Sequence, residues 1–168
     1  NRLLPPGTEG EICVRSDRVM KGYYKQEDAT STAIIDNWLH TGDVGKVDEG
    51  GYLFITGRKK DIIIRGGENI YPREVEEFIH GLPKVADVQV VGVPDERWGE
   101  AVKAIVVRRD GVEVTEAELI AYCREHLADV KCPRSVDFRS ELPRHPTGKL
   151  YKRLLKDEYW AGHESRLV

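Results

Sequence analysis

The sequence predicts an α+β fold in two parts, a β-rich first third and a small α+β domain that begins near residue 61. Three observations lead to this prediction. Short alternating or β-branched runs indicate strands, apolar residues spaced three and four apart indicate helices, and a charged stretch at residues 58–61 separates the two parts. A chain of 168 residues has room for one ordinary domain, or for a small domain and a piece of another.

The first third carries mainly strand signals. Residues 10–15 alternate in polarity, and residues 44–47 and 52–56 predict two strands joined by the hairpin loop Asp48-Glu49-Gly50-Gly51, whose glycines suit a tight turn. Residues 27–35 are expected to form a short helix. This part is therefore expected to be mostly sheet.

The second part alternates between strands and helices. Pro72 fits the first position of a helix, and Thr115 with Glu118 forms a capping box ahead of another. Residues 62–64 are a β-branched run typical of a strand buried on both faces. The expected strands are 62–64, 85–93, 101–108 and 135–139, and the expected helices are 72–80, 115–127 and 151–160.

A charged connector and a glycine turn lie between the two parts. The four charged residues at 58–61 should be solvated, and they form a candidate hinge. Gly66 and Gly67 permit positive φ and leave room for another backbone or a ligand to approach closely. We therefore expect this segment to move or to line a binding site.

Composition excludes several functions. Lys and Arg total 26 against 29 acidic residues, so a net charge of -3 argues against nucleic-acid binding. No apolar run is long enough to span a membrane, and a cytoplasmic location is expected. The three cysteines form no C-x-x-C pair and the five histidines form no H-E-x-x-H pair, so we expect reduced cysteines and no metal site.

Three motifs follow one another along the chain. Residues 38–45 read WLHTGDVG, residues 57–76 read GRKKDIIIRGGENIYPREVE, and residues 142–150 read LPRHPTGKL. In order and spacing they resemble the nucleotide-ribose, hinge-and-loop and catalytic-lysine motifs of the adenylate-forming superfamily. This superfamily holds acyl- and aryl-CoA synthetases, luciferases and the adenylation domains of peptide synthetases. Any one motif could arise by chance, but three in order make coincidence a poor explanation.

The resemblance implies a domain organisation. Residues 1–59 would be the β-rich end of the large adenylate-forming domain, and residues 60–168 a small mobile C-terminal lid with its hinge at about Lys60. The triphosphate loop and the acid pocket of the family are not recognisable in this sequence, and it opens at Asn1 without an initiator Met. The chain is therefore expected to be the C-terminal third of an enzyme and to be inactive alone.

The same resemblance assigns the adenylation residues. Lys149 would be the catalytic cation, Asp43 would accept the ribose hydroxyls, Arg58 would contact ribose or phosphate, and Ile55 would lie near the adenine. From the residues alone, Lys149 could be an ordinary solvated lysine and Asp43 a turn former.

Binding of CoA is assigned to the second part. Gly66, Gly67 and Glu68 would line the pantetheine tunnel, and Lys131 is a candidate for a CoA phosphate. Trp98 lies in a polar loop, where it could stack on the CoA adenine or serve equally well as a core anchor.

The sequence therefore predicts that the chain is part of an ATP-dependent acyl-CoA ligase. It would convert a carboxylic acid, with a fatty acid expected, to acyl-AMP and pyrophosphate, and then to acyl-CoA by domain alternation. ATP with Mg²⁺, bound mainly by the rest of the enzyme, and CoA are the expected cofactor and co-substrate. Partners would be the acid, the enzyme's own N-terminal domain and a lysine acetyltransferase acting on Lys149. The alternatives are a peptide-synthetase-type domain that loads a carrier protein and a non-catalytic nucleotide- or CoA-binding module.

Overall fold

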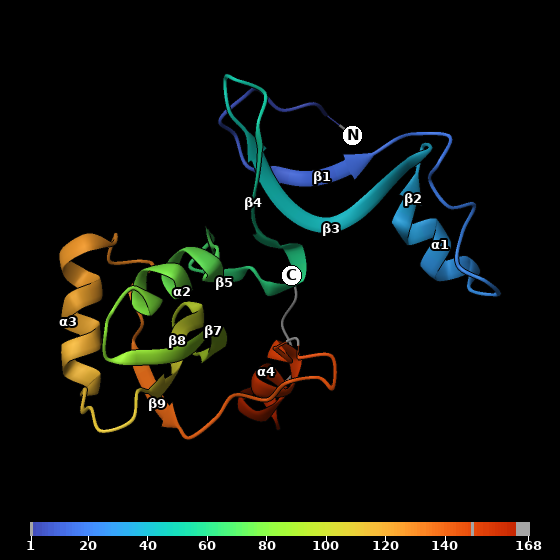
Figure 1. Ribbon diagram of the computed structural model, residues 1–168. Helices are drawn as coiled ribbons and strands as arrows, with labels where there is room; N and C mark the ends of the chain where they lie inside the picture. Colours follow the sequence, from blue (N-terminus) through green and yellow to red (C-terminus); the bar gives the residue numbers. More distant parts are fainter. Residues whose placement is uncertain (1, 149, 164–168) are drawn as a thin grey trace. The chain divides into compact units, whose positions relative to one another are not determined.

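The computed structural model describes residues 2–148 and 150–163, and Lys149 lies outside the described residues. The chain divides into two compact units, Asn1–Lys60 and Asp61–Val168 (Figure 1). Each unit contains its own sheet and at least one helix. The predicted α+β class is confirmed. In the described part of the chain, no helix combines the length and the apolar character needed to cross a membrane.

The first unit is an antiparallel sheet with one short helix. Strand β3 (Trp38–Val47) pairs with each of the other strands, which are β1 (Gly10–Val14), β2 (Ile34–Ile35) and β4 (Leu53–Arg58). The helix is α1 (Glu27–Ala33). Among the described residues of this unit, Val44 is the single buried apolar side chain. Such a sheet buries too little apolar surface to be stable by itself.

Two expectations for this unit were wrong. The helix expected at 27–35 ends at Ala33, because the β-branched residues Ile34 and Ile35 pair with β3 instead. Asp36 and Asn37 both have positive φ, of 52° and 64°, and form the two-residue turn between β2 and β3. As a result, β3 starts six residues earlier than the strand predicted at 44–47.

The second unit is built on a five-stranded sheet, preceded by the 3-10 turn Lys59–Asp61. Strand β8 is central: it is antiparallel to β5 and β7 and parallel to β9. The elements are β5 (Ile63–Arg65), β6 (Glu68–Ile70), α2 (Pro72–His80), β7 (Val85–Asp95), β8 (Gly99–Arg108), α3 (Glu116–His126), β9 (Ser135–Arg139) and α4 (Lys152–Trp160). The predicted capping box of Thr115 and Glu118 is present at the start of α3.

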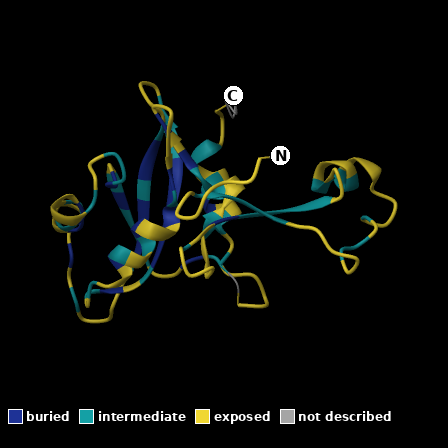
Figure 2. Ribbon diagram, turned by 90° about the horizontal axis from the view of Figure 1, so that it is seen from above, coloured by how far each residue is buried: buried dark blue, intermediate teal, exposed yellow. Residues whose placement is uncertain are grey.

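Helices cover both faces of this sheet. Val75 and Ile79 of α2 and Leu119 of α3 pack into one buried cluster, while Leu155 of α4 joins Ile105 in a second cluster. Buried residues, dark blue in Figure 2, gather on these strands. The second unit therefore holds almost all of the buried apolar residues described.

The strand predicted at 62–64 differs from expectation. It lies at Ile63–Arg65, and its apolar residues are not buried on both faces, since Ile63 is 1% exposed and Ile64 is 46% exposed. Gly66 and Gly67, with φ of 59° and 88°, turn the chain back into β6, a strand that the sequence did not predict. Strand β5 is therefore the first arm of a hairpin, with one face open.

Polar contacts anchor α4 to the sheet. The Lys103 ammonium lies 2.7 Å from Asp137 Oδ1, and the Tyr159 hydroxyl donates to the other oxygen of Asp137. Arg139 pairs with Glu158 of α4 at 2.6 Å. Burial by itself would raise the pKa of Asp137, but hydrogen bonds from Lys103 and Tyr159 outweigh it and lower the pKa. The carboxylate is therefore stabilised in its charged form.

We expect Asp137→Asn to weaken the attachment of α4 in a pH-dependent way. Because the folded pKa of Asp137 lies below the unfolded value of about 3.9, its contribution is present above that value and disappears as pH falls through the folded pKa. Amide hydrogen exchange of α4 should be faster in the variant near pH 6, with the difference shrinking as pH falls below about 3.9. Asp157→Asn, an exposed residue of the same helix, is the control. A difference that does not change with pH would contradict this role.

Candidate functional site

Asp43 and Arg58 meet at the same end of two paired strands. They are directly opposite in the pairing of β3 with β4, and Arg58 Nε donates to Asp43 Oδ1 at 3.0 Å. Both side chains remain partly exposed, at 38% and 43%. Asp43 therefore lies inside β3, rather than before a strand start as the sequence predicted. The arrangement presents a carboxylate and a guanidinium together at the surface.

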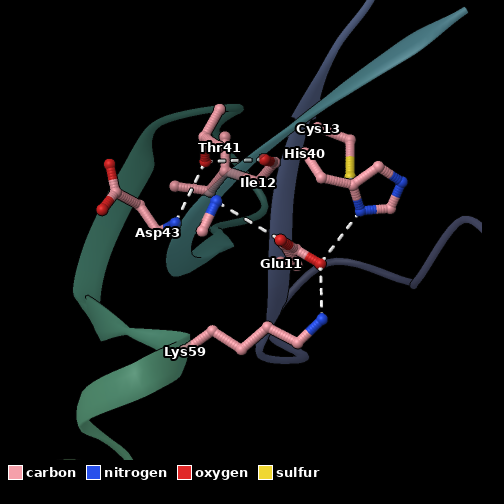
Figure 3. Close-up of polar contacts among 8 residues, drawn as sticks. Glu11, Ile12, Cys13, His40, Thr41, Asp43 and Lys59 are labelled. Atoms are coloured by element: carbon pink, nitrogen blue, oxygen red, sulfur yellow. Dashed lines mark hydrogen bonds and ion pairs between the residues drawn. The ribbon is translucent and has the colours of Figure 1, made fainter. Parts of the chain in front are cut away.

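The backbone around Asp43 is held by three hydrogen bonds to neighbouring groups. Gly42, with φ of 74°, donates its N–H to Glu11 Oε1 at 3.3 Å. The Thr41 hydroxyl donates to the Ile12 carbonyl at 2.8 Å and accepts from the Asp43 N–H at 3.1 Å (Figure 3). Thr41 and Glu11 thus fix the position from which the Asp43 side chain projects. Sequence analysis did not identify either residue.

Three ionisable side chains of the first unit lie around Glu11. Its Oε2 lies 3.0 Å from both Lys59 Nζ and His40 Nδ1, and the Cys13 sulfur lies 3.5 Å from the same histidine nitrogen (Figure 3). Burial would raise the pKa of Glu11, but hydrogen bonds from His40 and Lys59 prevail and lower it. Burial raises the pKa of the Cys13 thiol. The cluster therefore contains a carboxylate and a neutral thiol at neutral pH.

The predicted hinge residue lies at the boundary of the two units. Lys60 is the middle residue of the 3-10 turn Lys59–Asp61 and the last residue of the first unit. Its neighbour Lys59 is tied to β1 through Glu11. Ile55, the predicted adenine neighbour, lies on β4 and is 50% exposed. Ile55 therefore precedes Arg58 on β4, and Lys60 follows Arg58 in the next turn.

Gly66 and Trp98 form one surface in the second unit. The Gly66 N–H donates to the Trp98 carbonyl at 2.8 Å, and a Cβ at position 66 would lie 2.7 Å from the Trp98 ring. Trp98 is 42% exposed and lies outside both buried clusters, while the Arg97 guanidinium sits 4.8 Å from the ring centroid. The ring therefore lies against the glycine turn with one part open, outside both buried clusters.

Arg65 links this surface to the segment around Lys131. It is 7% exposed, donates to the Val130 carbonyl at 2.8 Å, and lies 5.9 Å from the Trp98 ring centroid. Lys131 itself pairs with both oxygens of Glu74, at 2.7 and 2.8 Å. The structure therefore connects Gly66, Trp98 and the 130–131 segment through a buried arginine that sequence analysis missed. Glu68 lies beside the turn, exposed at the start of β6.

The residues on either side of Lys149 are anchored to the sheet and to α2. Arg144 pairs with Asp87 of β7 and donates to the Gly148 carbonyl at 3.1 Å. Lys152 pairs with Glu76 of α2 at 2.6 Å, and both side chains are less than one-fifth exposed. Lys149, the predicted catalytic residue, lies outside the described residues. The described residues on either side of it are held by ion pairs.

We expect Gly66→Ala to displace Trp98. The added Cβ would enter the ring, whereas at Gly67, which shares the positive φ, the corresponding Cβ meets nothing within 4 Å. Both variants should lose about 1 kcal/mol for the left-handed backbone, measured by urea unfolding. Only Gly66→Ala should also shift the NMR signal of the Trp98 indole. Equal indole shifts in the two variants would contradict the packing described.

Comparisons with known proteins indicate the family of this chain. Residues 74–149 match the AMP-binding enzyme C-terminal domain. The long-chain-fatty-acid–CoA ligase FadD13 of Mycobacterium tuberculosis is 47% identical over 153 residues, covering 91% of this chain and 30% of the relative. The fatty acid–[acyl-carrier-protein] ligase ScoC of Streptomyces coeruleorubidus is 44% identical over 99% of this chain and 32% of its own length. ATP-bound MatB from Rhodopseudomonas palustris shares a TM-score of 0.89 at 41% identity, covering 93% of this chain and 31% of that structure.

The chain belongs to the adenylate-forming AMP-binding enzymes, and its curated relatives include acyl-CoA ligases. The resemblance found in the three sequence motifs is therefore confirmed. The chain spans about one-third of the length of the relatives that it matches.

Proposed function

We propose that this chain is the C-terminal portion of an ATP-dependent acyl-CoA ligase that activates a carboxylic acid, a fatty acid in the first instance, as acyl-AMP. The observation that carries the proposal is the pairing of Asp43 with Arg58 in the ribose motif, at 3.0 Å and at the surface. The identity to a fatty-acid–CoA ligase supports the substrate class. In this proposal, residues 1–59 end the large domain and residues 60–168 form the lid.

The chemistry requires a cation at the reacting phosphate. A carboxylate cannot expel hydroxide, so ATP converts it to a mixed anhydride with AMP and pyrophosphate leaves. Two anions must meet in this step, and negative charge develops on the phosphoryl oxygens. Lys149 supplies the positive charge in this proposal. Asp43 accepts hydrogen bonds from the ribose hydroxyls, Arg58 contacts ribose or phosphate, and Ile55 packs near the adenine, while ATP–Mg²⁺ is held mainly by residues outside this chain.

Transfer to CoA would use the second unit. We propose that rotation about Lys60 brings the turn of Gly66, Gly67 and Glu68 to the pantetheine path. The partly exposed Trp98 ring supports a stacking site for the CoA adenine. Lys131 could serve a CoA phosphate only after it exchanges its pairing with Glu74. The three free cysteines fit a reducing, cytoplasmic location.

A carrier protein is the alternative acceptor, because one relative is named a fatty acid–[acyl-carrier-protein] ligase. A non-catalytic module that only binds nucleotide or CoA is the second alternative. Thioester formation with CoA alone would favour the ligase, and transfer only to a carrier-protein phosphopantetheine would favour the first alternative. Binding of AMP or CoA without pyrophosphate release would favour the second.

Removal of the Lys149 ammonium should slow adenylation. We expect Lys149→Ala, made in the natural-length protein, to reduce acid-dependent ATP–pyrophosphate exchange by about 100- to 1000-fold, in line with the loss of one charge-stabilising group. Lys84→Ala is the control, since Lys84 is an exposed lysine that pairs with Glu118 in the same unit. Exchange at the unmutated rate in Lys149→Ala would contradict the assignment.

The hinge role of Lys60 predicts a different effect on the two half-reactions. Lys60→Pro fixes one φ angle within the 3-10 turn, so it should slow thioester formation far more than adenylation. Single-turnover assays of acyl-AMP formation and of its consumption by CoA separate the two steps. Lys60→Ala, which removes the charge but leaves φ free, controls for the side chain. Equal slowing of both steps by Lys60→Pro would remove the hinge assignment.

A further inference from the structure

We propose that Glu11, Cys13 and His40 form a binding site for a thiophilic divalent cation such as Zn²⁺. This site departs from the sequence-based expectation of no metal site, is distinct from the Mg²⁺ that accompanies ATP, and does not depend on the proposed activity. The three side chains offer one carboxylate oxygen, one sulfur and one imidazole nitrogen, and these ligand atoms all lie within 4.8 Å of one another.

The strand pairing brings the three ligands to one place. Cys13 and His40 are directly opposite in the pairing of β1 with β3, and Glu11 precedes Cys13 by two residues on β1. Residues two apart on a strand share a face. The register shifts between Glu11 and Cys13, so that His40 contacts both side chains (Figure 3). The ligands are therefore positioned by backbone pairing rather than by a flexible loop.

Two of the three distances between ligand atoms are close to those around tetrahedral zinc. With Zn–S of about 2.3 Å and Zn–N of about 2.0–2.1 Å, a sulfur and a nitrogen ligand lie roughly 3.5 Å apart. The Cys13 sulfur and His40 Nδ1 are 3.5 Å apart. A nitrogen and a carboxylate oxygen would lie roughly 3.4 Å apart around the same ion, and the observed 3.0 Å between His40 Nδ1 and Glu11 Oε2 requires only a small opening. A fourth position would remain for water.

The donor types select the metal. Thiolate and imidazole favour Zn²⁺ and its analogue Co²⁺, whereas Mg²⁺ and Ca²⁺ prefer sites made only of oxygen ligands. The Cys13 thiol must transfer its proton to solvent as the metal–sulfur bond forms. Metal binding at this site therefore releases a proton.

Lys59 is the competitor for this site. Its ammonium lies 3.0 Å from Glu11 Oε2, but the side chain is 65% exposed and can move into solvent. A cation would replace this ammonium at the carboxylate and so release Lys59, which immediately precedes the proposed hinge residue. Competition also has a distinctive consequence. Removal of the Lys59 charge should strengthen metal binding. If the cluster has no affinity for metal, removal of this charge will not change metal binding.

Cobalt titration of the natural-length protein at pH 7.5 tests the site. Absorbance in the near ultraviolet reports the bond between thiolate and Co²⁺, and displacement by Zn²⁺ removes the signal. We expect one Co²⁺ to give this band in the unmutated protein and in Cys132→Ser. Cys13→Ser should lose the band and weaken binding by more than about tenfold. Cys132 is the matched control because it is a free, buried cysteine in the other unit.

A second variant tests the site even if the Cys13→Ser variant does not fold. Lys59→Met should keep the band and bind Co²⁺ about fivefold more tightly, as expected for loss of one exposed ion pair that competes with the metal. Absence of the band in the unmutated protein would overturn the proposal. An equal signal in Cys13→Ser and the unmutated protein would also overturn it, and so would weaker binding in Lys59→Met.

Discussion

The Glu11 carboxylate is the constraint on which the arrangement of the first unit depends. One of its oxygens receives the Gly42 N–H beside Asp43, and the other lies 3.0 Å from His40 and from Lys59. A single side chain of β1 therefore contacts both the strand that presents the Asp43 carboxylate and Lys59, the residue immediately before the proposed hinge residue Lys60. These polar contacts join β1 to β3 and to the residue after β4, in a unit with little buried apolar surface.

In the second unit, packing of the sheet and separate ion pairs hold the proposed functional segments. Its sheet is covered on both faces, and ion pairs then fix the segments that leave it: Lys152 with Glu76, and Arg144 with Asp87. Arg65 performs a similar task for the glycine turn, since its guanidinium contacts the Val130 carbonyl and approaches Trp98. Each proposed functional segment of this unit is an exposed loop held by a partly or fully buried charged group.

The sequence predicted those features that depend on neighbours along the chain. The capping box of α3, the proline at the start of α2 and the two long strands of the second unit follow from local pattern, and the structure contains them. The missed features arise from contacts between distant residues. Strand β2 exists because Ile34 and Ile35 find a partner in β3, and Glu11 meets Lys59 across 48 positions. No spacing in the sequence indicates such a contact, and the same holds for Cys13 and His40.

Identification of the products tests the central claim most directly. The natural-length protein is incubated with ATP, Mg²⁺ and a fatty acid, first without and then with CoA, and the products are identified by mass spectrometry. The account predicts acyl-AMP and pyrophosphate in the first case and acyl-CoA with AMP in the second. Release of ADP and phosphate, or failure to form acyl-AMP from any carboxylic acid offered, would contradict it.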